Sequence, residues 1–230
     1  MGEIVPDVHL VDVSVGCNTY VIIDNGITLI DTGLRGNVAK IYSYIEKLGY
    51  GPKDIKRIII THAHLDHINC LRQLKQDTGA EVMVGEKDAD IISGKKPLHR
   101  MKGALSFIFN TLDVYYRYKP VDVDRVLKDG DTIGVLGGLS VVYLGGHSPG
   151  NIGLYSASRK LFFSSDSIRV IDGRLAAPHP RFTEDMPGAI NSIKRISELD
   201  FDVMLPGHGA PVLKDASAKV KDLYHEVKHF

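Results

Sequence analysis

Short β-rich runs and helical stripes alternate along the chain. Three β-rich runs open it, at residues 8–14, 19–24 and 27–30. Asp24-Asn25-Gly26 joins the last two as a hairpin turn, and a helix is predicted over 36–48 because apolar residues recur there at spacings of four and three. The β-branched run at 56–61 is typical of a strand buried on both faces.

The same alternation continues to the end of the chain. We predict helices at 66–78, 186–198 and 212–228, and strands at 81–84, within 132–164 and at 201–205. The pattern contains no linker, low-complexity segment or convincing repeat. It therefore indicates an α/β protein with a single domain over residues 1–230.

Residues 86–118 form a separate helical stretch, with an apolar stripe that repeats every three or four residues. The stripe consists of Leu98, Met101, Leu105, Ile108 and Leu112. Such a stripe fits a helix packed on the domain, a lid over a site or a dimer surface. We predict a helical lid insertion at about 86–118, and we leave a homodimer open.

Composition and charge narrow the choice of partners. Lys and Arg number 28, as do Asp and Glu, so the formal net charge is zero, and this disfavours a nucleic-acid partner. Residues 1–7 show no signal-peptide pattern, and no stretch has the roughly 20 apolar residues of a membrane span. We expect a cytoplasmic protein that binds a small molecule and no membrane. Two cysteines, Cys17 and Cys70, are too few for a disulfide framework, and we expect them in the core or a site wall.

The densest chemical signal is the segment Thr61-His62-Ala63-His64-Leu65-Asp66-His67, which follows a predicted strand. Residues i and i+2 of an extended backbone point to the same side, and a turn into a helix aims the next two ligands back. One metal ion hardly accommodates all four side chains. The spacing therefore suggests two metal positions.

Three later segments add candidate ligands, and each follows an apolar strand-like run. They contain His147 in a Gly-Gly-His-Ser-Pro-Gly segment, Asp166 in Ser-Ser-Asp-Ser, and His208 in Gly-His-Gly. Sites in α/β folds are commonly built where strands end. Each segment alone is a weak signal, but together with the first cluster they are specific.

This set of motifs, with Asp31-Thr32-Gly33 upstream, resembles the metallo-β-lactamase superfamily over residues 8–212. The resemblance implies a four-layer αββα sandwich of two mixed β-sheets flanked by helices. It also implies the ligands of two metal ions: His62, His64 and His147 for the first, Asp66, His67 and His208 for the second, and Asp166 for both. Asp31 would support these ligands from behind.

The implied chemistry is hydrolysis. These ligands suit two divalent ions, with zinc first and iron or manganese as alternatives. Ions that share a water produce a hydroxide near neutral pH, which attacks a carbonyl while Asp66 or Asp166 orients it or moves a proton. The similarity to glyoxalase II-like enzymes predicts a hydrolase of a small carbonyl ester, either a thioester or a lactone.

Two alternatives stay open within the same family resemblance. Persulfide dioxygenases use one iron on residues that match His62, His147 and Asp166, and nuclease members share the first cluster. Ser165 stands where many members of the family have glycine. Because it directly precedes the predicted ligand Asp166, this difference leaves the identity of the substrate undecided.

The sequence context of the remaining histidines indicates their surroundings. His179, on a loop between Asp166 and His208, is a candidate for substrate contact at the rim of the site. We expect His9, His99, His225 and His229 to be solvated.

Overall fold

The computed structural model describes residues 2–11, 13, 16–98 and 118–229. They divide into two compact units, Met1–Val126 and Leu127–Phe230. Most of the predicted lid, residues 99–117, lies outside the described part of the chain. Within residues 86–98 the structure has one short helix, α4 (Ala89–Ile92).

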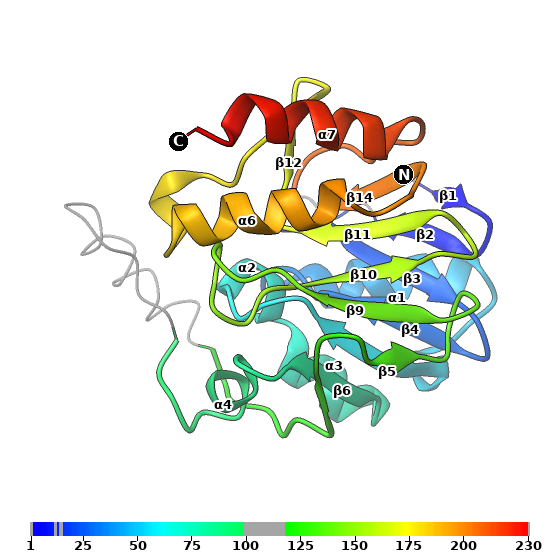
Figure 1. The fold of residues 1–230 in the computed structure, drawn as a ribbon. Helices are drawn as coiled ribbons and strands as arrows, with labels where there is room; N and C mark the ends of the chain where they lie inside the picture. The colour runs from blue at the N-terminus through cyan, green and yellow to red at the C-terminus, as the bar shows by residue number, and fades with distance from the viewer. Residues whose placement is uncertain (1, 12, 14–15, 99–117, 230) are drawn as a thin grey trace. The chain divides into compact units, whose positions relative to one another are not determined.

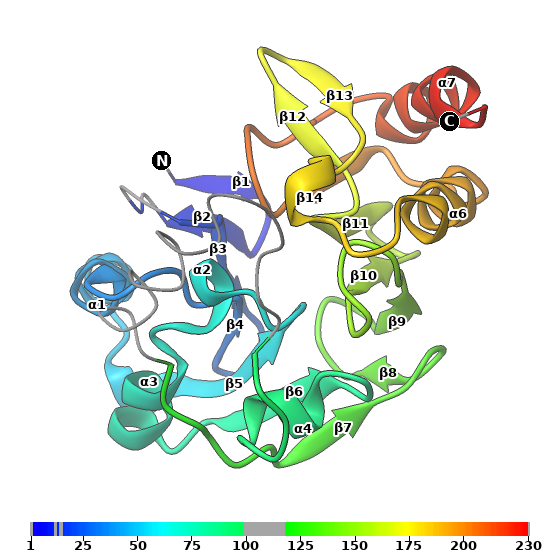
Figure 2. The same cartoon turned by 90° about the vertical axis from the view of Figure 1, so that its left-hand side faces the viewer.

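The first unit is built on a seven-stranded sheet with the order β1 to β7 along the chain (Figures 1 and 2). Its strands are β1 (Glu3–Val5), β2 (Val8–Val11), β3 (Thr19–Ile23), β4 (Ile27–Ile30), β5 (Ile55–Ile60), β6 (Glu81–Gly85) and β7 (Arg125–Leu127). Strands β1 to β4 pair antiparallel, whereas β4, β5 and β6 pair parallel. The first unit is therefore a mixed sheet.

Helices connect the parallel strands, as this pairing requires. They are α1 (Asn37–Lys47), the 3-10 turn η1 (Pro52–Asp54), α2 (Leu65–Ile68) and α3 (Leu71–Thr78). Ile41 and Ile45 of α1 are fully buried in a core cluster that also holds Ile58 of β5. The neighbouring residues Ile59 and Ile60 are buried as well, so this strand is covered on both faces, as its β-branched run predicts.

The second unit contains a five-stranded sheet and a small hairpin. The sheet has the order β14-β11-β10-β9-β8 and the hairpin is β12–β13. The strands are β8 (Thr132–Ile133), β9 (Leu139–Tyr143), β10 (Ile152–Ser156), β11 (Leu161–Ser165), β12 (Arg169–Ile171), β13 (Arg174–Ala176) and β14 (Val203–Pro206). Figure 2 shows the two strands of the hairpin side by side. Because β11 and β14 pair parallel and the other strands antiparallel, this sheet is also mixed.

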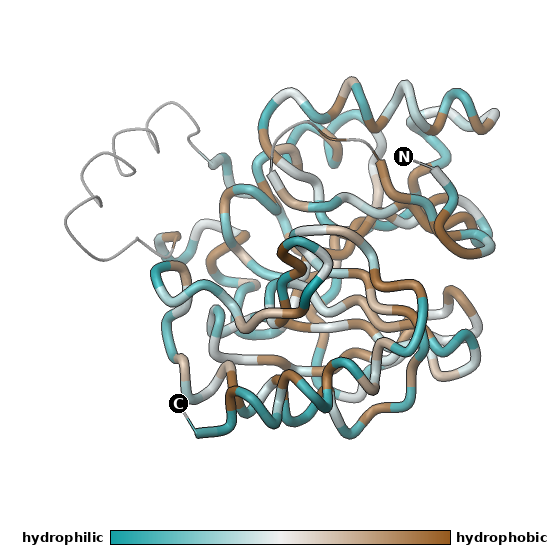
Figure 3. The backbone as a smooth tube through the Cα atoms, turned by 90° about the horizontal axis from the view of Figure 1, so that it is seen from above, coloured by the Kyte–Doolittle hydropathy of each residue, from teal (hydrophilic) through white to brown (hydrophobic). Residues whose placement is uncertain are grey.

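Two helices, α6 (Met186–Ser197) and α7 (Ala216–Val227), lie side by side on the second unit (Figures 1 and 2). Ile193 of α6 and Val220 of α7 are buried in one cluster with Phe162 of β11. Hydrophobic and hydrophilic positions alternate along the C-terminal helix, as the colours of Figure 3 show. Burial of one face of each helix explains why both predicted stripes form helices here.

The strand ends explain where the chemistry lies. Asp31 directly follows β4, Thr61 follows β5 and Asp166 follows β11. His147 lies in the loop after β9, and His208 lies two residues beyond β14. The prediction that each motif follows a strand is confirmed.

One prediction about an outlying histidine was wrong. His9, expected to be solvated, is buried on β2, and its Nδ1 lies 3.0 Å from the hydroxyl of Tyr44. A buried imidazole needs such a partner, and the partner is 35 residues away in the sequence. His225 and His229 are exposed as expected, while His99 lies outside the described residues.

Candidate metal centre

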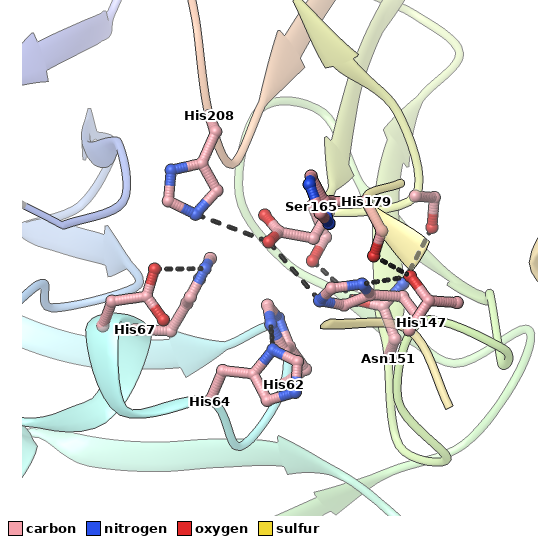
Figure 4. Close-up of polar contacts among 12 residues, drawn as sticks. His62, His64, His67, His147, Asn151, Ser165, His179 and His208 are labelled. Atoms are coloured by element: carbon pink, nitrogen blue, oxygen red, sulfur yellow. Dashed lines mark hydrogen bonds and ion pairs between the residues drawn. The ribbon is translucent and has the colours of Figure 1, made fainter. Parts of the chain in front are cut away.

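Three imidazoles of the first unit gather at the end of β5. Nε2 of His62 lies 3.0 Å from Nδ1 of His64, and the ring centroids of His62 and His67 are 4.0 Å apart. Figure 4 shows these three rings as sticks. Asp66, in the first turn of α2, places Oδ2 3.8 Å from Nε2 of His67. The residues of the predicted cluster therefore converge within this unit.

Asp31 connects the motif after β4 to this cluster. Its Oδ1 accepts a hydrogen bond from the backbone N–H of Thr61 at 2.8 Å. Its Oδ2 lies 2.8 Å from Nδ1 of His67 and also accepts a 2.8 Å hydrogen bond from the hydroxyl of Thr61. A carboxylate can only accept from a ring N–H here, so Nδ1 of His67 carries the proton and Nε2 keeps its lone pair for a metal ion.

Thr61 determines in a similar way which ring nitrogen of His62 carries the proton. Because the Thr61 hydroxyl donates its hydrogen to Asp31, its oxygen accepts from Nδ1 of His62, 3.1 Å away. This assignment of the proton leaves Nε2 of His62 free of hydrogen, as a metal ligand must be. Thr61 therefore links Asp31 to His62, a connection that the sequence does not reveal.

Two further residues support this cluster, and the sequence did not reveal their roles. Fully buried Asp88 accepts a 2.8 Å hydrogen bond from the backbone N–H of Ala63, between two predicted ligands. Cys17 is buried with its sulfur within 4.8 Å of ligand atoms of Asp31 and His67. Burial raises the pKa of the Cys17 thiol to about 12, so the thiol is protonated at neutral pH. The only sequence signal for Asp88 is its position shortly after β6.

The second unit brings together its three predicted ligands. Nε2 of His147 and Nε2 of His208 each lie 3.4 Å from the same oxygen, Oδ2 of Asp166 (Figure 4). His147 and Asp166 are buried, whereas the His208 side chain is 35% exposed. One carboxylate oxygen therefore faces two imidazole nitrogens from separate loops.

Thr183 orients His147 from behind. Its hydroxyl donates to the carbonyl of His179 at 3.0 Å, and its oxygen lies 3.4 Å from Nδ1 of His147. The hydroxyl therefore accepts from His147 and leaves Nε2 toward Asp166 without a proton. His179 itself is partly exposed and packs its ring on Phe182 at a centroid distance of 5.3 Å. It is linked to His147 through Thr183, and its predicted contact with substrate stays a prediction.

The chemistry of the donors fits divalent transition metals. Zinc–nitrogen bonds of about 2.0–2.1 Å at tetrahedral angles place two ligand atoms about 3.3 Å apart. The nitrogen and oxygen pairs at 3.0 and 3.4 Å in the two units match that spacing. Imidazole and carboxylate donors suit zinc and also accept iron or manganese.

A family model supports the same interpretation. The model described as "Metallo-beta-lactamase superfamily" matches residues 14–208. Among curated proteins, the uncharacterized protein YobT of Bacillus subtilis is 27% identical over 214 residues, which cover 89% of this chain and 87% of that protein. The hydroxyacylglutathione hydrolase GloC of Haemophilus influenzae is 28% identical over 192 residues, which cover 79% of this chain and 79% of that protein. The acyl-coenzyme A thioesterase MBLAC2 of Bos taurus is 28% identical over 65% of this chain and 54% of that protein.

Solved structures match nearly the whole chain. A metallo-beta-lactamase family protein from Thermus thermophilus superposes with a TM-score of 0.75 at 20% identity, over 99% of this chain and 81% of that one. The subclass B3 enzyme BJP-1 of Bradyrhizobium japonicum gives a TM-score of 0.72 at 22% identity, over 99% and 90%. These likenesses, together with two mixed sheets flanked by helices, confirm the predicted α/β fold class. Among the described residues, none of the helices is both long and apolar enough to cross a bilayer.

Proposed function

This chain belongs to the metallo-β-lactamase superfamily, whose members are metal-dependent hydrolases, and on that premise we propose that it hydrolyses a small carbonyl ester with two divalent metal ions. In this proposal His62, His64 and His147 hold the first ion. Asp66, His67 and His208 hold the second. Asp166 would be a ligand of both ions.

One observation carries the dinuclear proposal. Oδ2 of Asp166 is equally far, 3.4 Å, from Nε2 of His147 and Nε2 of His208. The family resemblance gives these two histidines to different ions. A carboxylate that faces one ligand of each ion is arranged as a bridge would be, and a mononuclear iron site would need only His147 of this pair.

The bound ions would supply a hydroxide near neutral pH and polarise the carbonyl oxygen of the ester. The protein's own groups orient the ligands and move the protons. Asp31 and Thr61 keep Nε2 of His67 and His62 unprotonated, and Thr183 does the same for His147. The Asp66 side chain is 34% exposed and that of Asp166 only 9%, so Asp66 is the carboxylate that can pass a proton to solvent.

The substrate class rests on the relatives. GloC is named for a glutathione thioester and MBLAC2 for acyl-coenzyme A thioesters. We therefore place a thioester of a small molecule first and a lactone second. Zero net charge agrees with a small-molecule substrate and gives no support to a nucleic-acid partner.

Thiol release from a panel of short acyl thioesters tests the proposal. The zinc-loaded protein should release thiol, the chelated protein should not, and readdition of zinc should restore the rate. Lactone opening under the same conditions serves as the second arm. A loaded protein that cleaves neither class would contradict the proposed function.

A further inference from the structure

Asn151 lies fully buried in the second unit, between the loop that carries His147 and the turn that carries Asp166. Its backbone and its side chain together close the first of these loops. Leu144 donates its N–H to the backbone carbonyl of Asn151 at 2.9 Å, and the side-chain Nδ2 of Asn151 donates to the carbonyl of Leu144 at 3.0 Å. His147 is therefore held inside a loop whose two ends are bonded to each other.

The side-chain amide of Asn151 then crosses to the Asp166 turn. Its Nδ2 donates to the hydroxyl of Ser167 at 2.8 Å, and its Oδ1 accepts from the hydroxyl of Ser165 at 2.6 Å. These two serines flank Asp166 on either side. One buried amide thus joins both neighbours of one predicted ligand to the loop of another.

The backbone conformation of Ser165 shows that the turn carrying Asp166 is tightly constrained. Its φ is 51°, in the left-handed region that favours glycine, and the family resemblance gives glycine at this position in many relatives. The side chain is strained in this conformation, but its hydroxyl makes the bond to Asn151 that glycine could not make. Ser165 therefore lacks the backbone freedom that glycine has at this φ, but its hydroxyl links the Asp166 turn to Asn151 through a hydrogen bond.

We infer that Asn151 is a positioning residue that fixes His147 and Asp166 relative to each other before a metal ion binds. The inference rests on the proposed function only in taking these two residues as ligands. A buried amide with three partners has no second arrangement that satisfies them all, so it holds the 3.4 Å spacing between Nε2 of His147 and Oδ2 of Asp166. Loss of this support should weaken metal binding, because a ligand pair that must be ordered by the ion binds it less tightly.

The substitution Asn151→Asp tests this with little change in volume. It replaces the donating amide by an oxygen that faces the carbonyl of Leu144 and the hydroxyl of Ser167. The zinc dissociation constant, measured by competition with a chromophoric chelator, should rise about 10- to 100-fold. The visible absorption of the cobalt-loaded variant should shift as well, since it reports ligand geometry. Ser165→Ala removes only one of the three bonds, so it should act in the same direction and carries the test if Asn151→Asp does not fold.

Ser156→Ala is the matched control. Ser156 is a buried serine of the same unit whose hydroxyl donates to the carbonyl of Leu136 at 2.8 Å, on β10 and away from the predicted ligands. It should lower the thermal midpoint of the metal-free protein and leave zinc affinity and the cobalt spectrum unchanged. If Asn151→Asp and Ser165→Ala behave like this control, the amide is only structural and the inference is wrong. Because affinity is read without substrate, a protein that binds zinc but cleaves no ester would refute the proposed function and not this inference.

Discussion

Asp31 accepts a hydrogen bond from His67, with 2.8 Å between Oδ2 of the carboxylate and Nδ1 of the ring. Both residues are buried, and the same oxygen accepts the hydroxyl of Thr61, which is itself in contact with Nδ1 of His62. One carboxylate therefore sets the proton position on two imidazoles, directly and through a threonine. This arrangement explains why an aspartate directly follows β4.

Asp31→Asn should accordingly weaken metal binding. An amide of similar size cannot accept from the Thr61 backbone, the Thr61 hydroxyl and His67 at once, so both rings lose their fixed orientation. We expect a loss of about 10- to 100-fold in metal affinity or activity, measured by chelator competition and thioester turnover. Asp129→Asn, which changes an exposed carboxylate paired with Arg195, is the control and should leave both quantities unchanged. Equal affinity of Asp31→Asn and the unaltered protein would refute the role of Asp31.

Asp129 also gives a prediction about pH. Partial burial alone would raise the pKa of this carboxyl. The hydrogen bonds from Arg195 and from the N–H of Tyr143, together with the positive charge of Arg195, outweigh the effect of burial and lower the pKa from its ordinary value of 3.8. A lowered pKa in the folded state contributes stability that is present above pH 3.8 and is lost as the pH falls through the folded value. Because both side chains are more than two fifths exposed, the contribution is small, about 1 kcal/mol or less.

The measurement compares urea unfolding of Asp129→Asn with the unaltered protein between neutral and strongly acidic pH. The variant should be slightly less stable at neutral pH, and the difference should shrink as the pH falls below 4. A difference that grows in acid would mean that the pair with Arg195 does not stabilise the fold.

The sequence predicted the strands, the helices and the metal-binding motifs because these depend on local patterns. The run Ile58–Ile60 indicates a buried strand by itself, and the cluster after it stands within a few residues. The supporting residues could not be found in this way. The bond from Ala63 to Asp88 spans 25 residues, that from Ser165 to Asn151 spans 14, and that from His147 to Thr183 spans 36. Buried polar partners of this kind become neighbours only when the chain has folded, so a local sequence pattern does not reveal them. His9 and Tyr44, 35 residues apart, are another such pair.

The predicted lid at about 86–118 is tested by a separate experiment. Its central residues lie in 99–117, outside the described part of the chain, and the apolar stripe there motivates the prediction. Replacing Leu105 or Ile108 with aspartate should change KM among thioesters more than the thermal midpoint. A large loss of stability with unchanged selectivity would identify the stripe as ordinary core.

Asp166→Ala is the strongest single-residue test of the shared ligand. Its removal takes a carboxylate from both predicted ion positions at once, whereas each histidine serves one. We expect metal occupancy to fall and turnover to drop at least about 10²-fold, the scale on which losing a key electrostatic group reduces catalysis. Metal analysis and thioester turnover on the same preparation check this. Near-normal values for both would remove Asp166 from the site.

His208→Ala, assayed for metal content and turnover together, tests the central claim most directly. The residue faces Asp166 Oδ2 at 3.4 Å and belongs, in the proposal, to the second ion alone. The dinuclear hydrolase predicts about two metal ions per chain before the substitution, about one after it, and loss of most thioester hydrolysis. One iron per chain in both proteins, with oxygen uptake on a persulfide that survives the substitution, would contradict the account.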